Sequence, residues 1–302
     1  MANQLAHDPQ VVLVVDFGAQ YAQLIARRVR EAQVYSEIVP HKISAQEVLK
    51  RQPIAIILSG GPASVHVDGA PVLDPKIYEL GIPILGICYG AQLIAEQLGG
   101  KVSRGGRGEY GRTVAQRIAG AVSQLLKDDI PAQLNVWMSH FDAVSVLPSG
   151  FVATASTRDA PMAVIENPEK KIWGVQYHPE VVHTEYGQSI IEQFLHRLVG
   201  AKRDWTMSSI VEDQVAAIRE QIGTERVICG LSGGVDSAVA AALVHKAVGK
   251  QLTCIYVDIG LMRKNESEQV VETFHRHMGI ELIHVDAGAR FFEKLRGVTE
   301  PE

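Results

Sequence analysis

A cysteine flanked by glycines is the first feature of the sequence that could do chemistry. The apolar run 83–87 leads into Gly86-Ile-Cys88-Tyr89-Gly90, and a helical pattern follows. A nucleophile on such a strand-to-helix turn has strained backbone angles and needs small residues two positions before and after it. Amides at the helix N-terminus favour a thiolate, and the Tyr89 N–H can face a developing oxyanion. The pattern predicts a nucleophilic Cys88; the alternative is a small buried cysteine.

A histidine and a glutamate two residues apart supply the complementary groups. Pro179 restricts His178 to extended backbone, so this histidine should stand at the end of the strand pattern that precedes it. Glu180 is near enough to accept one imidazole N–H, which leaves the other ring nitrogen facing a thiol. The sequence therefore predicts a catalytic triad of Cys88, His178 and Glu180.

A glycine loop offers a second part of the same site. The segment SGGP at 59–62 follows the apolar run 54–58. Glycine amides in such a loop can approach a ligand closely. We expect the Gly60 N–H to form an oxyanion hole together with the Tyr89 N–H. The alternative for a strand followed by two glycines and a proline is an ordinary tight turn.

A different glycine loop, SGGVDS at 232–237, follows the apolar run 227–231 and precedes an alanine-rich helical pattern. Strand, loop and helix in this order present backbone amides to an anion. The loop lacks the lysine of a Walker loop, and Asp236 would repel a phosphate unless a divalent cation lay between them. Ser232 and Ser237 can donate hydrogen bonds to phosphate oxygens. The pattern predicts a nucleotide bound with Mg²⁺; the alternative is a capped glycine turn.

Two α/β units are needed to position these residues. Over 11–100, apolar runs alternate with amphipathic segments, which is typical of βαβ units and a parallel sheet. Over 101–177 the alternating stretches are shorter and favour an antiparallel or mixed extension. A helix over about 187–198 would close the first unit.

A second unit is expected after the stretch 200–207, with Ser208 or Ser209 capping its first helix. Its strands are expected at 227–231, 252–258 and 281–285, with helices after Asp236 and near 266–277. The predicted fold class is α/β: a mixed, mostly parallel sheet flanked by helices over 10–203, followed by a partial second α/β domain over 208–302.

Composition is that of a folded protein. The chain has 302 residues, 46% of them hydrophobic and 21% charged, which suits roughly two globular domains and excludes a disordered chain. The net charge of −5 gives no footprint for nucleic acid or anionic membranes, although Arg104, Arg107 and Arg112 could form a local basic patch.

Cysteine usage and the absence of targeting signals bear on the compartment. The three cysteines are an odd count without disulfide spacing, which fits a reducing environment. The N-terminal residues lack a signal-peptide pattern, and no apolar run approaches the roughly 18 residues of a membrane helix. We expect a cytoplasmic protein with no membrane contact.

Four segments in this order resemble class I, triad-type glutamine amidotransferase domains over about residues 11–200. They are SGGP at 59–62, GICYGAQ at 86–92, WMSHFD at 137–142 and GVQYHPE at 174–180. The resemblance implies that Cys88 attacks the side-chain amide of glutamine, that His178 protonates the leaving ammonia and then activates water, and that Glu180 orients His178. It also implies glutamine-binding roles for Gln92, Ser139, His140 and Asp142, although His140 could equally be structural.

The loop at 232–237 resembles the pyrophosphate loop of N-type ATP pyrophosphatases, which cleave ATP between its α- and β-phosphates and adenylate a carbonyl oxygen before ammonia displaces AMP. The stretch from Val257 to Arg263 is similar to the nucleotide-binding stretch of the GMP synthetase family, ligases that join both modules in this order. The implied ATP-binding residues are Ser232, Gly233, Gly234, Val235, Asp236, Ser237, Ala238 and Asp258. Asp236 would meet Mg²⁺ through the nucleotide.

The GMP synthetase family converts xanthosine monophosphate, ATP and glutamine to GMP, AMP, pyrophosphate and glutamate. Its members continue past the position of residue 302 through the rest of the synthetase domain and a dimerisation domain. We therefore expect the acceptor site to lie mostly outside this sequence and a homodimer only for the complete enzyme. Whether the sequence is a fragment or a natural truncation stays open.

Two other functions stay open at this point. The first is a truncated nucleotide-binding or regulatory module with little catalysis. The second is the glutaminase half of another amidotransferase, against which the loop at 232–237 argues, because carbamoyl-phosphate, CTP and anthranilate synthesis use other partner domains.

Overall fold

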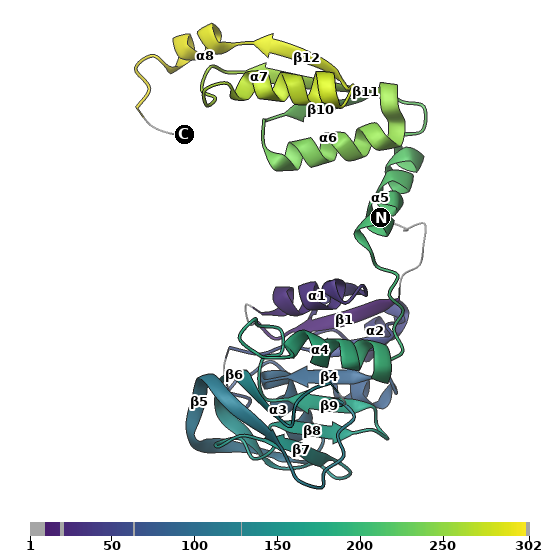
Figure 1. Ribbon diagram of the computed structural model, residues 1–302, viewed down its shortest axis with the longest axis vertical. Helices are drawn as coiled ribbons and strands as arrows, with labels where there is room; N and C mark the ends of the chain where they lie inside the picture. Colours follow the sequence, from purple (N-terminus) through teal and green to yellow (C-terminus); the bar gives the residue numbers. More distant parts are fainter. Residues whose placement is uncertain (1–9, 19–20, 63, 128, 300–302) are drawn as a thin grey trace. The chain divides into compact units, whose positions relative to one another are not determined.

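The computed structural model describes residues 10–18, 21–62, 64–127 and 129–299, except for the side chains of 105–107, 207–209, 275 and 277. The chain divides into two compact units, with the boundary between Trp205 and Thr206 (Figure 1). Each unit is described by itself below.

The first unit is built on one mixed sheet. Among the described residues this sheet has the strand order β2-β1-β3-β4-β9-β8-β7-β5-β6. The strands are β1 (Val11–Asp16), β2 (Tyr35–Pro40), β3 (Ala55–Leu58), β4 (Ile84–Ile87), β5 (Lys101–Arg117), β6 (Gln133–Val146), β7 (Val152–Ser156), β8 (Val164–Asn167) and β9 (Ile172–Val175). Strands β2, β1, β3, β4 and β9 run parallel, and the rest pair antiparallel. The predicted mixed α/β fold is confirmed.

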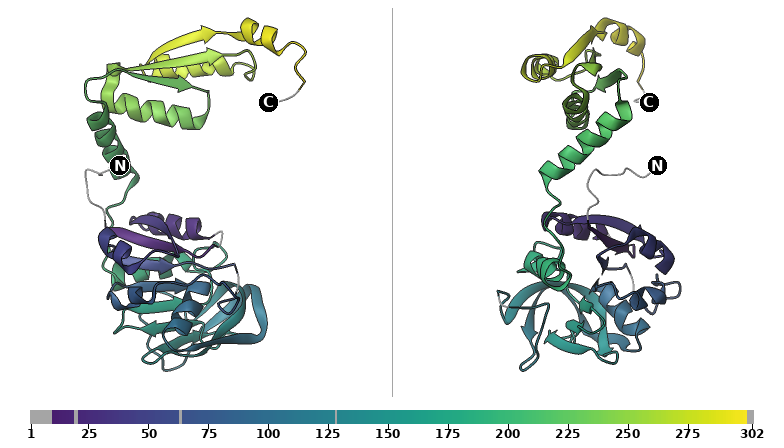
Figure 2. Two further views of the ribbon diagram at one scale, coloured as in Figure 1. Left: turned by 180° about the vertical axis from the view of Figure 1, so that it is seen from behind. Right: turned by 90° about the vertical axis from the view of Figure 1, so that its right-hand side faces the viewer.

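Helices cover both faces of the parallel part (Figure 2). One core includes apolar residues of α1 (Ala22–Glu31) and α4 (Gly187–Glu192), and the other includes those of α2 (Ala45–Arg51) and α3 (Tyr89–Gln97). Because both faces are covered, β3 and β4 are buried along their whole length, which explains their continuous apolar sequences. Helix α4 continues as a π-helix, Gln193–Leu198, so the helix predicted over 187–198 is confirmed.

The antiparallel part is longer than its sequence pattern suggested. Strands β5 and β6 form an extended pair, whose register shifts between Arg104 and Glu109. This shift belongs to a β-bulge or similar irregularity, which bends the strand and redirects its side chains. The Arg104 guanidinium lies 5.0 Å from the ring centroid of Phe141. The side chain of Arg107, the second residue of the expected basic patch, lies outside the described residues.

The second unit contains, among the described residues, a parallel sheet in the order β10-β11-β12. Its strands are β10 (Val227–Leu231), β11 (Leu252–Asp258) and β12 (Glu281–Asp286), and its helices are α5 (Met207–Ile222), α6 (Val235–Val248), α7 (Glu266–Val271) with a π-helical continuation Glu272–His277, and α8 (Gly288–Leu295). All three predicted strands are confirmed. Helix α5 begins at Met207, so the expectation that Ser208 or Ser209 caps it is wrong: both lie in its first turn. No described helix is long and apolar enough to cross a membrane.

Candidate active site

Cys88 stands on a strained turn between β4 and α3. Its backbone angles are φ 52° and ψ −104°, a region that L-residues seldom occupy. A Cβ on Gly86 would lie 2.7 Å from the Ala91 nitrogen, and one on Gly90 would lie 2.5 Å from the Leu58 oxygen. The two flanking glycines are therefore required by backbone contacts, as the sequence pattern implied.

The sheet brings the predicted site residues to one edge. Strand β4 lies between β3 and β9, all three parallel, and Ile87 pairs with Val175. Cys88, the residue after β4, therefore lies next to the C-terminal end of β9. Its N–H donates to the Val175 carbonyl at 2.8 Å. On the other side, the Gly90 N–H donates to the Ser59 carbonyl at 3.1 Å. Ligands commonly bind at this carboxyl edge of parallel strands.

His178 and Glu180 form a buried pair. The His178 Nδ1 lies 2.8 Å from Glu180 Oε1, and the residues are 3% and 0% exposed. The backbone on both sides of the ring is fixed, because the His178 N–H donates to the Trp137 carbonyl at 3.0 Å and Thr184 Oγ1 donates to the His178 carbonyl at 2.6 Å. A carboxylate at Nδ1 fixes the tautomer that leaves Nε2 for proton transfer.

The electrostatic surroundings of His178 favour its charged form. Burial alone would lower the pKa of His178, but hydrogen bonds with Cys88 and Glu180 and their charges raise it to about 11. The imidazole is thus hydrogen-bonded to Glu180, and Cys88 lies close enough to act on its charge. This arrangement can hold an imidazolium beside a thiolate and return its proton to a leaving group.

We expect Glu180→Gln to remove this electrostatic support. A raised His178 pKa stabilises the folded state fully below the ordinary value of 6.5, and this stabilisation is lost as pH rises through about 11. The difference in unfolding free energy between the parent and the variant should therefore shrink with rising pH. We expect a loss of about 2 kcal/mol at pH 6. Urea unfolding at pH 6, 8 and 10 measures it, with the exposed Glu169→Gln as control. An equal loss at all three pH values would contradict this account.

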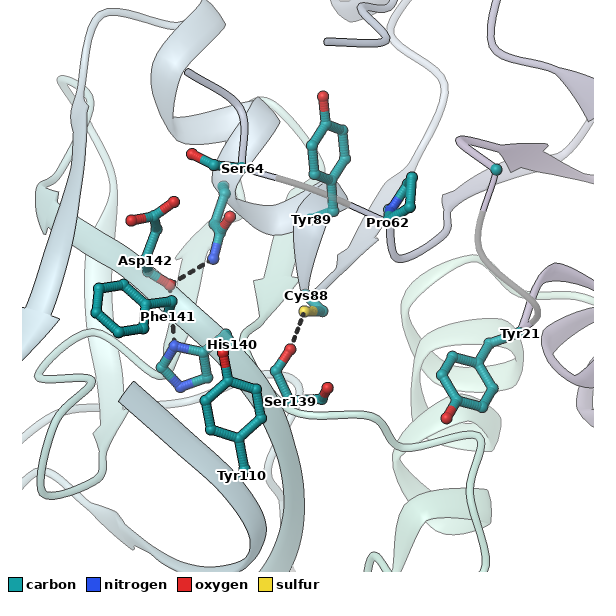
Figure 3. A pocket seen from close by; sticks show the side chains of 13 residues that line it. Tyr21, Pro62, Ser64, Cys88, Tyr89, Tyr110, Ser139, His140, Phe141 and Asp142 are labelled. Atoms are coloured by element: carbon teal, nitrogen blue, oxygen red, sulfur yellow. Dashed lines mark hydrogen bonds between the residues drawn. The ribbon is translucent and has the colours of Figure 1, made fainter. Parts of the chain in front are cut away.

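A cavity of about 560 Å³ opens at the Cys88 side chain (Figure 3). All four residues expected to hold glutamine line it, namely Gln92, Ser139, His140 and Asp142. His178 and Glu180 do not line this cavity. Cys88 lines the cavity and neighbours His178, and the ring of Tyr21, another lining residue, lies 5.2 Å from the His178 ring between centroids. The volume suits a small-molecule ligand.

The residues of the predicted oxyanion hole lie on either side of this turn. Tyr89 lines the cavity, whereas Gly60 does not, and its neighbour Gly61 does. The loop packs closely on Tyr89, since a Cβ on Gly61 would lie 2.6 Å from the ring. Because the next amide, the Gly90 N–H, is bonded to Ser59, the Tyr89 N–H is the first amide of the turn that can face a ligand.

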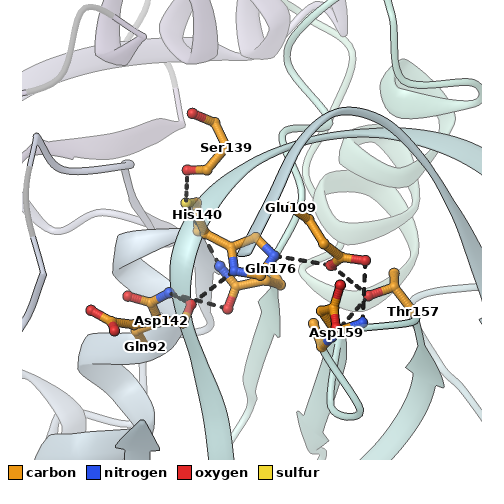
Figure 4. Close-up of polar contacts among 10 residues, drawn as sticks. Gln92, Glu109, Ser139, His140, Asp142, Thr157, Asp159 and Gln176 are labelled. Atoms are coloured by element: carbon orange, nitrogen blue, oxygen red, sulfur yellow. Dashed lines mark hydrogen bonds and ion pairs between the residues drawn. The ribbon is translucent and has the colours of Figure 1, made fainter. Parts of the chain in front are cut away.

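A polar network lies beside the cavity (Figure 4). Both His140 ring nitrogens have protein partners: Nδ1 lies 2.9 Å from the Asp142 carbonyl oxygen, and Nε2 lies 3.1 Å from Glu109 Oε2. The Gln92 amide donates to the same carbonyl at 2.6 Å. The ring of His140 is therefore engaged structurally, which favours the alternative left open for this residue.

The network includes residues that were not predicted from the sequence, among them Glu109 and Gln176. Glu109 reaches His140 only because β5 pairs with β6, and no local pattern indicates it. Gln176 donates to Cys88 Sγ at 3.7 Å. A signal for Gln176 did exist, since it lies two residues before His178 within the segment 174–180 on which the resemblance rests.

The Glu109 carboxylate gives a prediction at acid pH. Burial would raise the pKa of Glu109, but hydrogen bonds from His140, Thr157 and the Asp159 N–H hold it below the ordinary 4.5. Its stabilising contribution is therefore present above pH 4.5 and lost as pH falls through the lower folded value. We expect Glu109→Gln to cost about 2 kcal/mol at pH 7 and progressively less below pH 4. Urea unfolding at pH 7, 4 and 3 tests this, and a cost independent of pH would contradict it.

The predicted phosphate loop of the second unit lies at the N-terminus of α6. Gly233 has φ 81°, and Ser232 Oγ accepts the Gly234 N–H at 3.3 Å and lies 3.1 Å from Ser237 Oγ. Ser237 Oγ also bonds to the Gly234 carbonyl at 3.0 Å. These bonds tie the loop to the first turn of α6, which includes Val235, Asp236 and Ala238.

Asp258 is placed differently from the other residues expected to bind ATP. It ends β11, which is parallel to β10 with Leu231 opposite Tyr256, so both chains leave the same sheet edge. Asp258 Oδ1, however, accepts the Gly260 N–H at 2.8 Å. A hydrogen bond from Ser267, together with this one, lowers the pKa of Asp258. It lines a cavity of about 370 Å³ to which the 232–237 loop does not contribute.

The donor set of this loop does not form a metal site by itself. Among the described residues, no group of three or more His, Cys, Asp or Glu side chains could hold a metal ion. Asp236 is one exposed carboxylate at the start of α6. A divalent cation here would need most of its ligands from nucleotide phosphates and water, which is the mode that Mg²⁺ prefers.

The first unit has the geometry of a nucleophile-elbow hydrolase with a cysteine in place of the more familiar serine: a strained Cys88 turn, an adjoining cavity and a buried histidine–carboxylate pair. Residues 13–198 match the family model described as glutamine amidotransferase class-I, and residues 207–294 match the one described as NAD synthase. The chain belongs to the class I glutamine amidotransferase family.

Individual relatives agree with this assignment. The chain is 57% identical over 301 residues to the glutamine-hydrolyzing GMP synthase of Streptomyces coelicolor, covering 100% of this chain and 57% of the relative. It is 59% identical over 291 residues to that of Bifidobacterium longum, covering 96% of this chain and 54% of the relative. The chain thus spans little more than half the length of these curated relatives.

Solved structures resemble the first unit. A GMP synthase subunit from Thermoplasma acidophilum aligns with a TM-score of 0.57 at 30% identity, covering 64% of this chain and 96% of that protein. A glutamine amidotransferase from Thermotoga maritima aligns with a TM-score of 0.51 at 18% identity, covering 65% of this chain and all of that protein, and supports the fold alone.

Proposed function

We propose that the first unit, residues 10–203, hydrolyses glutamine to glutamate and ammonia. The observation that carries this proposal is that Cys88 lines an open cavity and neighbours His178, which is itself hydrogen-bonded to Glu180. Hydrolysis of a carboxamide needs a nucleophile, a proton carrier and an oxyanion site, and each has a candidate at this edge of the sheet.

In the proposed reaction the Cys88 sulfur attacks the side-chain carbonyl carbon of glutamine. The carbonyl oxygen becomes an oxyanion that faces the Tyr89 N–H at the cavity. His178 gives its proton to the amide nitrogen, which leaves as ammonia, and a thioester remains on Cys88. His178 then takes a proton from water, and the hydroxide releases glutamate and restores the thiol.

We infer that the second unit, residues 208–302, binds ATP through Ser232–Ser237 and the N-terminus of α6, with Asp236 meeting Mg²⁺ through the phosphates. Together with the rest of a GMP synthase, it would activate xanthosine monophosphate with ATP, so that ammonia yields GMP, AMP and pyrophosphate. The relatives named GMP synthase support this assignment over other amidotransferases. We also propose that the protein is cytoplasmic and that the complete enzyme is a homodimer.

Glutamate release by this chain, with and without MgATP, tests the first part. We expect glutamate and ammonia to be released in equal amounts. We expect MgATP to raise the rate of glutamate release, because nucleotide binding in the second unit would promote hydrolysis. Binding of MgATP measured by calorimetry tests the second part, with Ser237→Ala as the variant and the exposed Val239→Ala as its neighbour on α6.

The outcomes separate the competing functions. Nucleotide binding without glutamate release under any condition would favour a regulatory module. Glutamate release without nucleotide binding would favour the glutaminase half of another amidotransferase. Formation of GMP by the complete gene product, from either glutamine or ammonia, is the result expected for a GMP synthase.

A further inference from the structure

The network beside the cavity has a direction that is fixed by one backbone carbonyl. The Asp142 carbonyl oxygen can only accept hydrogen bonds, and the Gln92 side chain approaches it at 2.6 Å. The Gln92 atom at this contact must therefore be the amide nitrogen. Its second hydrogen points to Gln176 Oε1 at 3.2 Å.

This order determines what Gln176 presents to the nucleophile. Since its oxygen accepts from Gln92, its nitrogen is the atom 3.7 Å from Cys88 Sγ. A carboxamide N–H aimed at sulfur stabilises the thiolate more than the thiol, because hydrogen bonds to charged acceptors are the stronger ones. Gln176 is 2% exposed, so water does not compete for this contact.

Glu109 and His140 hold the Asp142 carbonyl, from which the orientation of Gln92 follows, in place. The Glu109 carboxylate also accepts from Thr157 Oγ1 at 2.7 Å and from the Asp159 N–H at 3.3 Å, so it acts as an acceptor throughout. His140 lies between this carboxylate and the Asp142 carbonyl, with Nε2 3.1 Å from Glu109 Oε2 and Nδ1 2.9 Å from the carbonyl oxygen. The carbonyl that orients Gln92 is thereby fixed from the β5–β6 pair (Figure 4).

We propose that Gln176 is a positioning residue of the nucleophile, which holds Cys88 Sγ through an N–H whose direction is imposed by Asp142 and Gln92. This inference rests on the proposed glutaminase function and adds a residue to it. Cys88 Sγ also lies 3.8 Å from the Ser139 carbonyl oxygen, which would repel a thiolate. The Gln176 N–H offsets that repulsion and directs the sulfur within reach of His178.

Alkylation of Cys88 by iodoacetamide tests the proposal without glutamine turnover. The rate is followed between pH 5 and 9 by mass spectrometry of the peptide that carries Cys88. Gln176→Met removes the donor at similar volume, and Gln176→Glu keeps an acceptor for Gln92 but faces the sulfur with an oxygen. Gln193→Met is the matched control, because its amide donates to the Gln124 carbonyl outside the site.

We expect both Gln176 variants to react about tenfold more slowly at pH 7, with the pH of half-maximal rate displaced upwards and more so for Gln176→Glu. The Gln193→Met variant should match the parent. A merely structural role would reduce the folded fraction, seen by circular dichroism, without moving the pH profile. An unchanged profile in a folded variant would overturn the proposal.

A measurement on the unaltered chain covers the case in which both variants fail to fold. The side-chain amide resonances of Gln176 should shift when Cys88 is alkylated, and no shift would overturn the proposal. The role of Gln176 and the glutaminase function can be tested separately. A normal profile in the variants of a chain that releases glutamate contradicts the role of Gln176, whereas a reactive Cys88 without glutamate release contradicts the glutaminase.

Discussion

Replacement of Cys88 by alanine is expected to lower glutamate release by on the order of 10⁴-fold or more. The Cys88 side chain lines the cavity and neighbours His178, and the variant keeps every backbone contact of the turn. Without sulfur no thioester forms, and the imidazole has only water to activate. The assay is release of glutamate by the purified chain.

Cys229→Ala is the matched control, since Cys229 is also a free cysteine but lies on β10 of the second unit. It should release glutamate as the parent does. In an enzyme with the GMP synthase function proposed above, Cys88→Ala should abolish synthesis with glutamine and keep synthesis with ammonia, because the acceptor chemistry would belong to the synthetase domain. Equal loss of both activities would refute this division of labour.

Gly90→Ala is expected to destabilise the first unit by about 3 kcal/mol, although glycine-to-alanine changes inside helices ordinarily stabilise by up to about 1 kcal/mol. The reason is contact with strand β3. The added Cβ would lie 2.5 Å from the Leu58 oxygen and 2.7 Å from the Leu58 Cβ, and backbone atoms of a buried central strand cannot move aside cheaply. Thermal and urea unfolding measure the loss.

Gly81→Ala separates this collision from ordinary backbone strain. Gly81 has φ 69°, so alanine is strained there, but its Cβ would meet nothing within 4 Å. We expect a cost of about 1 kcal/mol at Gly81 and a clearly larger one at Gly90. Similar costs at both positions would show that α3 shifts away from β3 without penalty. In that case the Cys88 turn would also tolerate displacement.

Sequence reasoning located the parallel strands and the Cys88 turn well, because buried strands with glycine turns leave a local pattern. It missed α2, although Ser44 and Glu47 form a capping box that the structure shows directly. The signal for this helix was short and polar, and its burial against other elements supplies most of its stability.

The polar network was beyond such reasoning for a different cause. Glu109 and His140 meet through the pairing of two long strands whose register shifts nearby, and sequence spacing does not fix that shift. Sequence spacing also does not tell whether the His140 ring binds substrate or has protein partners on both nitrogens. His140 could be named from its motif, but its partners could be identified only from the fold.

The position of β9 has a consequence for how the protein becomes active during synthesis. This strand, Ile172–Val175, is the last of its sheet in sequence, yet it lies between β4 and β8. A nascent chain that already contains Cys88 therefore has an open sheet and no histidine beside the thiol. Insertion of a late central strand requires distant pairing, which is slow. Pairing of β9 with β4 thus completes the sheet and at the same time brings the segment that carries His178 to Cys88.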